Sequence, residues 1–398
     1  MMKVLQINSF FSKGGPPRIV HGIYETIAKN GDECLVAAAR ETPLPGMNTY
    51  RIGTKLTTYL CAIQSRVLDN DGFVARRATK KLINQIKEYN PDVIHLHNLH
   101  GYYINVELLF EYLKKAGKPV VWTMHDCWAI TGHCPTFSEI RCEKYLTGCN
   151  HCPLKKEYPS SLILDASRKN WLRKKESFNG VPNLTIVCVS KWLETVIKDS
   201  YLSDYTTEVI YNGVDLSSFK RNISNFREKY HLENKRLILG VALHWVKRKG
   251  ILDFITLAEL LDERYQVVLV GNINSKDCSN RILNISPTSN DDELADIYSA
   301  CDICLNLSYV ESFGLTTIES LACGTPVITY DQTAVPEIAR QFDMPVVPAG
   351  DIYRLKDAIE SFFEQGKKNI KSFDVSHFER GLQYDKYYNL YKKLCYEK

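Results

Sequence analysis

Short apolar runs alternate with amphipathic stretches along the first half of the chain. The apolar runs are rich in Val, Ile and Leu, which is typical of strands that are buried on both faces of a parallel sheet. Between them, apolar residues recur at the spacing of a helix that packs one face on a sheet. The runs are KVLQINSF, ECLVAAA, DVIHLHN, PVVWTMH and TIVCVS, separated by helical patterns such as IVHGIYETIAKNG and ARRATKKLINQIKEYN. This order predicts a doubly wound α/β domain.

The same pattern begins again after Asn212. Its apolar runs are RLILGVAL, YQVVLVGN, DICLNLS and PVITYD, with helical stretches such as GILDFITLAELLDE between them. A chain of 398 residues is long for a single core. We therefore predict two Rossmann-like domains, residues 1–212 and 213–376, that face each other across a cleft. The aromatic stretch 377–398 is predicted to form a helix that crosses back to the first domain.

The composition, 44% hydrophobic and 24% charged, is that of a globular protein. The sequence has neither an apolar run long enough to span a membrane nor a secretory signal pattern, so we expect a cytosolic protein. The net charge of +4 is uneven, because residues up to Asn212 contain 27 Lys and Arg against 20 Asp and Glu. In this half, SRKNWLRKKESF places basic residues around Trp171 and Leu172. It is either a peripheral contact with the inner membrane leaflet or a solvated basic helix.

Two candidate groups directly follow predicted strands of the first domain, where ligands of open parallel sheets bind. Gly14 and Gly15 follow the first strand and let the backbone approach a phosphate or a sugar hydroxyl. They do not form G-x-G-x-x-G, and no single acid follows the second strand for a dinucleotide ribose, which disfavours an oxidoreductase. His125 follows PVVWTM and is predicted to point into the cleft. The alternative is a structural histidine with Asp126 as its partner or as a helix cap.

The second domain contains the string SYVESFGLTTIESLACGTPVITYD, with Glu311 and Glu319. If a helix begins near Gly314, Glu319 lies in its second turn and Glu311 in the loop before it. Carboxylates accept pairs of hydroxyl protons, and free amides at a helix start suit a diphosphate. Vicinal hydroxyls and a diphosphate occur together in sugar nucleotides, whereas an exposed surface Glu explains either residue alone. We therefore predict a sugar-nucleotide site.

This string resembles the retaining GT-B glycosyltransferases of the large bacterial family four, which includes mannosyl- and capsule-type transferases. VIYNGVD at 209–215, RKG at 248–250 and the early Gly-Gly pair also match. VIHLHNLHGYYIN and TMHDCW further resemble the branch that assembles colanic-acid-type exopolysaccharides. The resemblance covers nearly the whole chain. It implies a UDP- or GDP-hexose donor in the second domain and a glycan or polyprenyl-diphosphate-linked acceptor in the first.

The resemblance also implies roles for single residues. Glu319 would hold the nucleotide ribose and Glu311 the hydroxyls of the transferred sugar. The backbone amides of Phe313, Gly314 and Leu315 would bind the donor.

The cations of the site follow from the same resemblance. Lys249 would face the diphosphate, and His125 would lie near the acceptor. Many relatives have an Arg six residues before this Lys, but here the position is Leu243, so Arg248 or Lys247 is expected to replace it. Transfer would proceed with retention and without a catalytic metal, because fixed cations and amides stabilise the departing diphosphate.

Four cysteines of the loop 127–153 have a spacing that suits a metal. Cys134, Cys142, Cys149 and Cys152 form C-x(7)-C-x(6)-C-x(2)-C, which ends in a common zinc half-site. A structural zinc would stabilise a polar loop that lacks a core. Cys127 and His133 are spare ligands, and the alternatives are a redox pair or unrelated thiols.

Two other motifs resemble metal sites. His95, His97 and His100 in HLHNLH have metal-like spacing, but in the family such a run usually lines the fold. Asp69 and Asp71 in DND resemble the Asp-x-Asp of metal-using transferases, yet no strand precedes them, so we interpret DND as a turn.

Two other functions are compatible with parts of the sequence. A non-catalytic, zinc-stabilised protein that binds a polyanion fits the basic half, but it leaves the Glu311–Glu319 string unexplained. A GT-B epimerase or phosphorylase would share the two-domain architecture. We expect no nucleic-acid partner, because no basic strip is interleaved with stacking aromatics.

Overall fold

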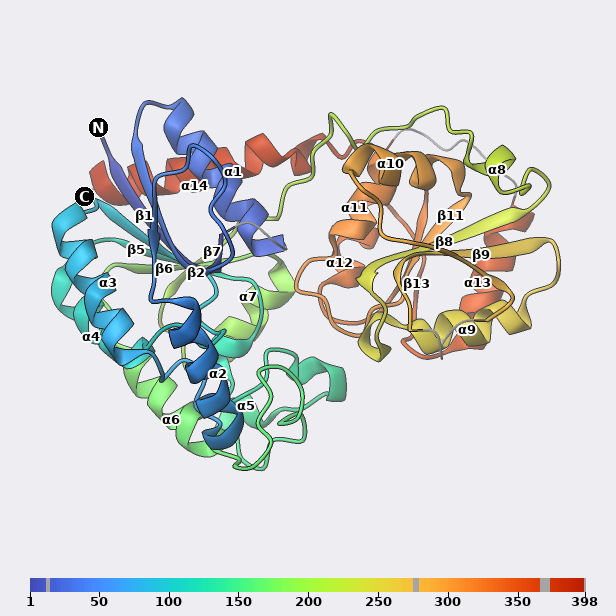
Figure 1. The fold of residues 1–398 in the computed structure, drawn as a ribbon. Helices are drawn as coiled ribbons and strands as arrows, with labels where there is room; N and C mark the ends of the chain where they lie inside the picture. The colour runs from blue at the N-terminus through green and yellow to red at the C-terminus, as the bar shows by residue number, and fades with distance from the viewer. Residues whose placement is uncertain (12–14, 275–278, 366–372, 397–398) are drawn as a thin grey trace. The chain divides into compact units, whose positions relative to one another are not determined.

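The computed structural model describes residues 1–11, 15–274, 279–365 and 373–396 (Figure 1). The chain divides into two compact units, Met1–Tyr211 with Gln383–Lys398, and Asn212–Leu382. Each unit is built on one parallel sheet with helices, so the predicted α/β class of two Rossmann-like domains is confirmed. No helix in the described parts of the chain is long and apolar enough to cross a lipid bilayer.

The first unit has a seven-stranded parallel sheet in the order β3-β2-β1-β4-β5-β6-β7. The strands are β1 (Lys3–Phe10), β2 (Glu33–Arg40), β3 (Thr49–Arg51), β4 (Val93–Leu96), β5 (Val120–Met124), β6 (Leu184–Cys188) and β7 (Thr206–Val209). Every residue of β4, β5 and β6 is buried, because helices cover both faces of the sheet. The strand order reverses between β1 and β4, and in open α/β sheets ligands bind beyond the carboxyl ends of the strands at such a point.

Helices of the first unit connect these strands. They are α1 (Gly15–Lys29), α2 (Lys55–Leu68), α3 (Arg76–Tyr89), α4 (Val106–Ala116), α5 (Lys144–Thr147), α6 (Ser167–Phe178) and α7 (Lys191–Lys198), with the 3-10 turns η1 (Trp128–Ile130) and η2 (Phe137–Ile140). Most of the last helix, α14 (Arg380–Tyr396), also belongs to this unit. Its Tyr387, Leu390 and Tyr391 share one buried cluster with residues of α1 and β1.

The second unit has a six-stranded parallel sheet in the order β10-β9-β8-β11-β12-β13. Its strands are β8 (Arg236–His244), β9 (Tyr265–Asn272), β10 (Ile282–Ile285), β11 (Ile303–Asn306), β12 (Val327–Tyr330) and β13 (Val346–Val347). Its helices are α8 (Phe226–Lys229), α9 (Ile251–Leu260), α10 (Asp291–Ala300), α11 (Leu315–Ala322), α12 (Val335–Gln341) and α13 (Ile352–Glu364), with 3-10 turns η3 (Lys247–Lys249) and η5 (Ser376–Phe378). In this sheet the strand order reverses between β8 and β11.

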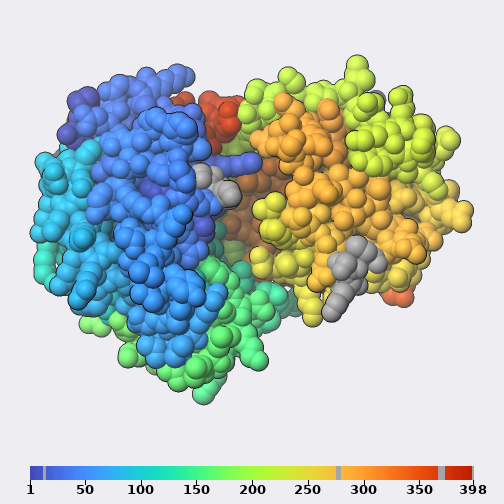
Figure 2. Space-filling model, viewed as in Figure 1, coloured from blue at the N-terminus to red at the C-terminus, as the bar shows by residue number. Residues whose placement is uncertain are grey.

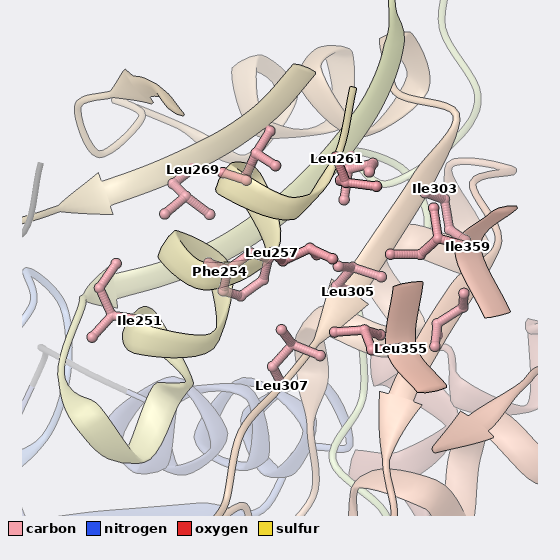
Figure 3. Close-up of a cluster of buried hydrophobic side chains, with 14 of the residues drawn as sticks. Ile251, Phe254, Leu257, Leu261, Leu269, Ile303, Leu305, Leu307, Leu355 and Ile359 are labelled. Atoms are coloured by element: carbon pink, nitrogen blue, oxygen red, sulfur yellow. The ribbon is translucent and has the colours of Figure 1, made fainter. Parts of the chain in front are cut away.

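The core of the second unit lies between its sheet and helices α9 and α13 (Figure 3). Phe254 and Leu257 of α9 meet Leu305 of β11, and Leu355 and Ile359 of α13 close the cluster. All five side chains are at most 2% exposed. This packing holds β8 and β11 rigidly side by side, and the loops that follow them start from fixed positions.

Replacing Gly22 with Ala should destabilise the first unit, because an added methyl group would meet the Tyr384 ring at 2.0 Å. Overpacking of this kind costs about 1–3 kcal/mol, which a thermal unfolding scan detects as a lower Tm. In the double variant with Tyr384→Ala the two losses should not add, because the obstructing ring is gone. Fully additive losses would show that α1 and α14 do not pack through this contact.

Candidate functional site

The second unit gathers its predicted site residues at the carboxyl ends of β8 and β11. The turn η3 follows β8, and the loop from Leu307 to Gly314 follows β11. The Tyr309 N–H donates to the Arg248 carbonyl oxygen at 2.9 Å, which joins the two segments. Gly250 has φ 77°, and a side chain there would meet the Leu307 carbonyl oxygen at 2.5 Å, so this approach requires glycine.

Lys249 and Glu311 form an ion pair in this place. Both side chains are about three quarters buried, with exposures of 27% and 20%. The Ser308 hydroxyl donates to the same Glu311 oxygen at 3.3 Å, and the Glu311 N–H donates to the Thr333 hydroxyl at 3.0 Å. The structure therefore brings together two predicted residues that stand 62 positions apart. The Ser308 hydroxyl holds the carboxylate and the Thr333 hydroxyl holds the backbone of Glu311; sequence reasoning missed both residues.

Helix α11 begins directly after this loop, as the sequence predicts. Gly314 is its N-cap residue, with a left-handed φ of 92°. Glu319 lies in the second turn, where the Tyr298 hydroxyl donates to its carboxylate at 3.1 Å. The first amides of a helix have no earlier turn to bond to, so they are available to an anion. A carboxylate, an ammonium and a helix start thus lie on connected segments of one sheet edge.

The predicted second cation is less tightly placed. Arg248 and Lys247 of η3 have exposed side chains, and Leu243 near the end of β8 is 66% exposed. The apolar Leu243 cannot neutralise a diphosphate. The replacement of the missing Arg by Arg248 or Lys247 stays a prediction.

In the first unit, His125 directly follows β5. Hydrogen bonds connect it to residues of β1 and of the segment after β4, the two strands between which the strand order reverses. Its Nε2 lies 3.0 Å from Nδ1 of His97, which follows β4. Nε2 of His97 lies 3.1 Å from Oε1 of Gln6 on β1. All three side chains are at least 92% buried. Sequence reasoning missed Gln6, although a polar residue inside the apolar run KVLQINSF was a signal.

The hydrogen bonds of Gln6 determine which ring nitrogen of His97 and of His125 carries the proton. The Gln6 amide nitrogen donates to the Val20 carbonyl oxygen at 3.0 Å, so Oε1 must face His97 as an acceptor. His97 therefore carries its proton on Nε2 and presents the lone pair of Nδ1 to His125. His125 in turn donates its Nε2 proton to His97, which leaves Nδ1 of His125 as an acceptor. Burial lowers the pKa of His125 to about 4, so this imidazole is neutral at physiological pH.

Asp126 does not pair with His125. Its carboxylate contacts Nε2 of His100 at 2.8 Å and accepts the N–H of Trp128 at 2.8 Å, so it caps η1. Burial acts to raise the pKa of Asp126, but the neighbouring His100 outweighs it and the pKa is lowered. The same pairing outweighs the burial of His100 and raises its pKa.

The three histidines of HLHNLH have separate partners. His95 contacts Thr123 and Tyr391, at 2.8 and 2.6 Å, whereas His97 contacts Gln6 and His125. They line the fold rather than share one ligand.

The DND residues form a turn, as interpreted from the sequence. Asp69 caps the end of α2, and Asp71 accepts the amides of Gly101 and Tyr102 at 3.0 and 2.8 Å. These buried carboxylates are used for structure.

The structure removes two residues of the basic helix α6 from the predicted membrane contact, whereas Leu172 is 47% exposed. Trp171 is 5% exposed, and its indole N–H donates to the Tyr145 carbonyl oxygen at 2.9 Å. Lys174 is 1% exposed and donates to the carbonyl oxygens of Trp128 and Thr131 at 2.7 and 3.0 Å. Burial lowers the pKa of Lys174 to about 7. Neither side chain is available to lipid.

The four candidate zinc ligands line one cavity, together with His133; they are Cys134, Cys142, Cys149 and Cys152. Asp69 holds Nδ1 of His133, and the buried Nε2 has no hydrogen-bond partner within the described residues. However, no three or more His, Cys, Asp or Glu side chains in those residues form a group that could hold a metal ion. Zinc binding would require the thiols to turn further into the cavity. The site stays a prediction.

Two predicted site residues of the first unit precede or begin α1. Gly15 is the first residue of this helix, and a side chain there would meet no atom within 4 Å. Gly14 lies outside the described residues. Within the described residues, space for a ligand adjoins Gly15, and its role stays a prediction.

Two all-parallel α/β units, the second with a Lys–Glu pair and a helix start at its reversal point, place the protein among the GT-B glycosyltransferases by fold. The model of Glycosyltransferase Family 4 matches residues 13–218, and that of Glycosyl transferases group 1 matches residues 222–372. The chain belongs to Glycosyltransferase Family 4.

Similar proteins agree with this family. The protein named as the colanic acid biosynthesis glycosyl transferase WcaC of Escherichia coli (strain K12) is 25% identical over 275 residues, 67% of this chain and 66% of WcaC. The match thus spans slightly less than two thirds of that relative. Among solved structures, a sucrose-phosphate synthase from Thermosynechococcus elongatus has a TM-score of 0.70 at 17% identity, and all of both chains is covered. Anabaena HepE in complex with UDP has a TM-score of 0.68 at 14% identity, with 98% and 99% coverage. At these identities the structures show the shared fold.

The zinc prediction requires the four thiols to converge on one point, which they do not do in the described residues, and purified protein would then contain about one zinc ion per chain. Elemental analysis after dialysis measures it. Cys149→Ser should lower the zinc content, whereas Cys395→Ser, outside the loop, should not. Protein that is folded and free of zinc would contradict the site.

Proposed function

We propose that this protein is a glycosyltransferase that moves a hexose from UDP-hexose or GDP-hexose to a glycan or polyprenyl-diphosphate-linked acceptor. The observation that carries this proposal is the Lys249–Glu311 pair beside the start of α11, with Glu319 one turn further on. This set matches the diphosphate, sugar and ribose of one ligand. The similarity to WcaC supports a place in surface polysaccharide synthesis.

In the proposed reaction the bond between the anomeric carbon and the diphosphate oxygen breaks. Negative charge then grows on the diphosphate, and Lys249, Arg248 and the first amides of α11 stabilise it. Glu311 binds hydroxyls of the transferred hexose, and Glu319 binds the ribose. The reaction proceeds with retention. It needs no catalytic metal, because the cations of η3 neutralise the charge on the departing diphosphate.

His125 orients the acceptor hydroxyl in this proposal. Its Nδ1 accepts the hydroxyl proton in a hydrogen bond, because Nε2 is committed to His97. With a pKa of about 4 the imidazole is too weak a base to hold that proton at neutral pH. The proton therefore passes to the departing phosphate oxygen, while the hydroxyl oxygen bonds to the anomeric carbon.

Glu319→Gln should weaken donor binding by about tenfold or more, since a hydrogen bond to a charged partner contributes about 1.5–3 kcal/mol. The measurement is thermal stabilisation by a panel of UDP- and GDP-sugars with EDTA present. Glu259→Gln, an exposed glutamate of α9, is the matched control and should bind as the wild type does. The absence of any shift with folded wild-type protein would contradict the donor site. Release of nucleoside diphosphate that requires added acceptor separates transfer from epimerase or phosphorylase activity.

His97→Phe should lower kcat for transfer by about one to two orders of magnitude, because His125 loses the acceptor that sets its proton position. His97→Asn retains an acceptor oxygen near the place of Nδ1 and should lose much less. Donor affinity should stay at the wild-type value in both variants, and ¹⁵N NMR should show Nδ1 of His125 unprotonated in the wild type. Equal losses in the two variants would indicate a merely structural role for His97.

A further inference from the structure

Helix α2 turns its apolar side chains away from the unit to which it belongs. Leu56, Tyr59, Leu60, Ile63 and Val67 recur at the spacing of one helix face, and each is 38–65% exposed. The residues that α2 buries are the small Cys61 and Ser65. A surface helix normally packs its apolar stripe on the core, so this helix has the reverse arrangement. Helix α2 lies on the face of the molecule drawn in Figure 2.

A second exposed apolar segment continues this stripe. Leu162, Ile163 and Leu164 are 66%, 62% and 48% exposed. The Leu162 N–H donates to the Arg66 carbonyl oxygen at 2.7 Å, and the Leu164 N–H donates to that of Val67 at 3.2 Å. The two segments therefore form one continuous apolar patch. Exposed patches of this kind mark interaction surfaces.

The charged side chains of helix α2 itself are basic. The acidic Asp165, which follows Leu164, has its carboxylate bonded to the N–H groups of Cys152 and Ser167. Helix α2 contains no Asp or Glu, begins with Lys55 and has Arg66 in its last turn. The ammonium of Lys155 donates to the Ile163 carbonyl oxygen at 3.2 Å, so a third cation adjoins the second segment. Leucines, a tyrosine and basic side chains together are typical of a helix that lies in the interface of an anionic bilayer.

We propose that α2 and residues 162–164 form a docking surface for an anionic phospholipid bilayer. The apolar stripe lies among the upper acyl chains, while Lys55, Arg66 and Lys155 contact lipid phosphates. Binding to lipid does not rest on the proposed transfer reaction. It would hold the first unit beside a lipid-linked acceptor.

Sedimentation with vesicles of phosphatidylcholine, alone or mixed with phosphatidylglycerol, tests this surface. The full chain should bind the anionic vesicles. Leu60→Ser should weaken binding about tenfold, as expected for removing one large apolar side chain from the interface. Leu252→Ser is the matched control, because Leu252 is a helical leucine of the second unit with 49% exposure against 55% for Leu60. Arg66→Gln should weaken binding to anionic vesicles about fivefold and leave neutral vesicles unaffected.

Two results would overturn the docking surface. The first is equal vesicle binding by Leu60→Ser and Leu252→Ser. The second is a wild-type dimer that Leu60→Ser dissociates, without binding to vesicles, which would assign the patch to self-association. Donor-induced thermal stabilisation, measured in parallel, should be the same in all these variants. If vesicle binding follows the predicted order but no donor stabilises any of them, the transfer reaction fails and the docking surface stands.

Discussion

Both units depend on the parallel alignment of their strands, which brings the carboxyl end of every strand to one edge of the sheet. In the second unit β8 and β11 are hydrogen-bonded neighbours, so the turn after one strand meets the loop after the other. Lys249 and Glu311 form their ion pair at this meeting point. In the first unit the neighbours β1, β4 and β5 place Gln6, His97 and His125 in one chain of hydrogen bonds.

The low polarity of the buried sheet edge determines which atoms donate and which accept in the hydrogen bonds among Gln6, His97 and His125. A buried polar atom without a partner is unfavourable, so each nitrogen must donate or accept. Because the Gln6 amide nitrogen already donates to Val20, only one placement of the His97 and His125 protons satisfies the remaining hydrogen bonds. Burial also keeps His125 neutral, by lowering its pKa to about 4. The same environment that makes the imidazole a good acceptor makes it a poor base.

Apolar periodicity predicted the buried strands but not the partly exposed β3, β7, β10 and β13, and it predicted the surfaces poorly. Runs such as VIHL and VVWTM are apolar throughout because both faces of a parallel strand are covered, and no orientation has to be inferred. To predict which residues of a helix are exposed, one must also know whether its apolar stripe faces the core or the solvent. In α6 the basic composition suggested a lipid contact, yet Trp171 and Lys174 point inward. In α2 the apolar stripe points outward, and only its exposed fractions reveal this.

The family resemblance supplied Lys249. The sequence by itself determined the two α/β units, the start of α11 near Gly314, and the positions of Glu311 in the loop and Glu319 in the second helix turn. These features depend on local periodicity and turn chemistry, which neighbouring residues set. The tertiary structure decided the partners: Lys249 with Glu311, His125 with His97 instead of Asp126, and Asp69 with His133. Each pair joins residues that are 28 or more positions apart. Such contacts arise from strand order and helix orientation, which one-dimensional spacing does not encode.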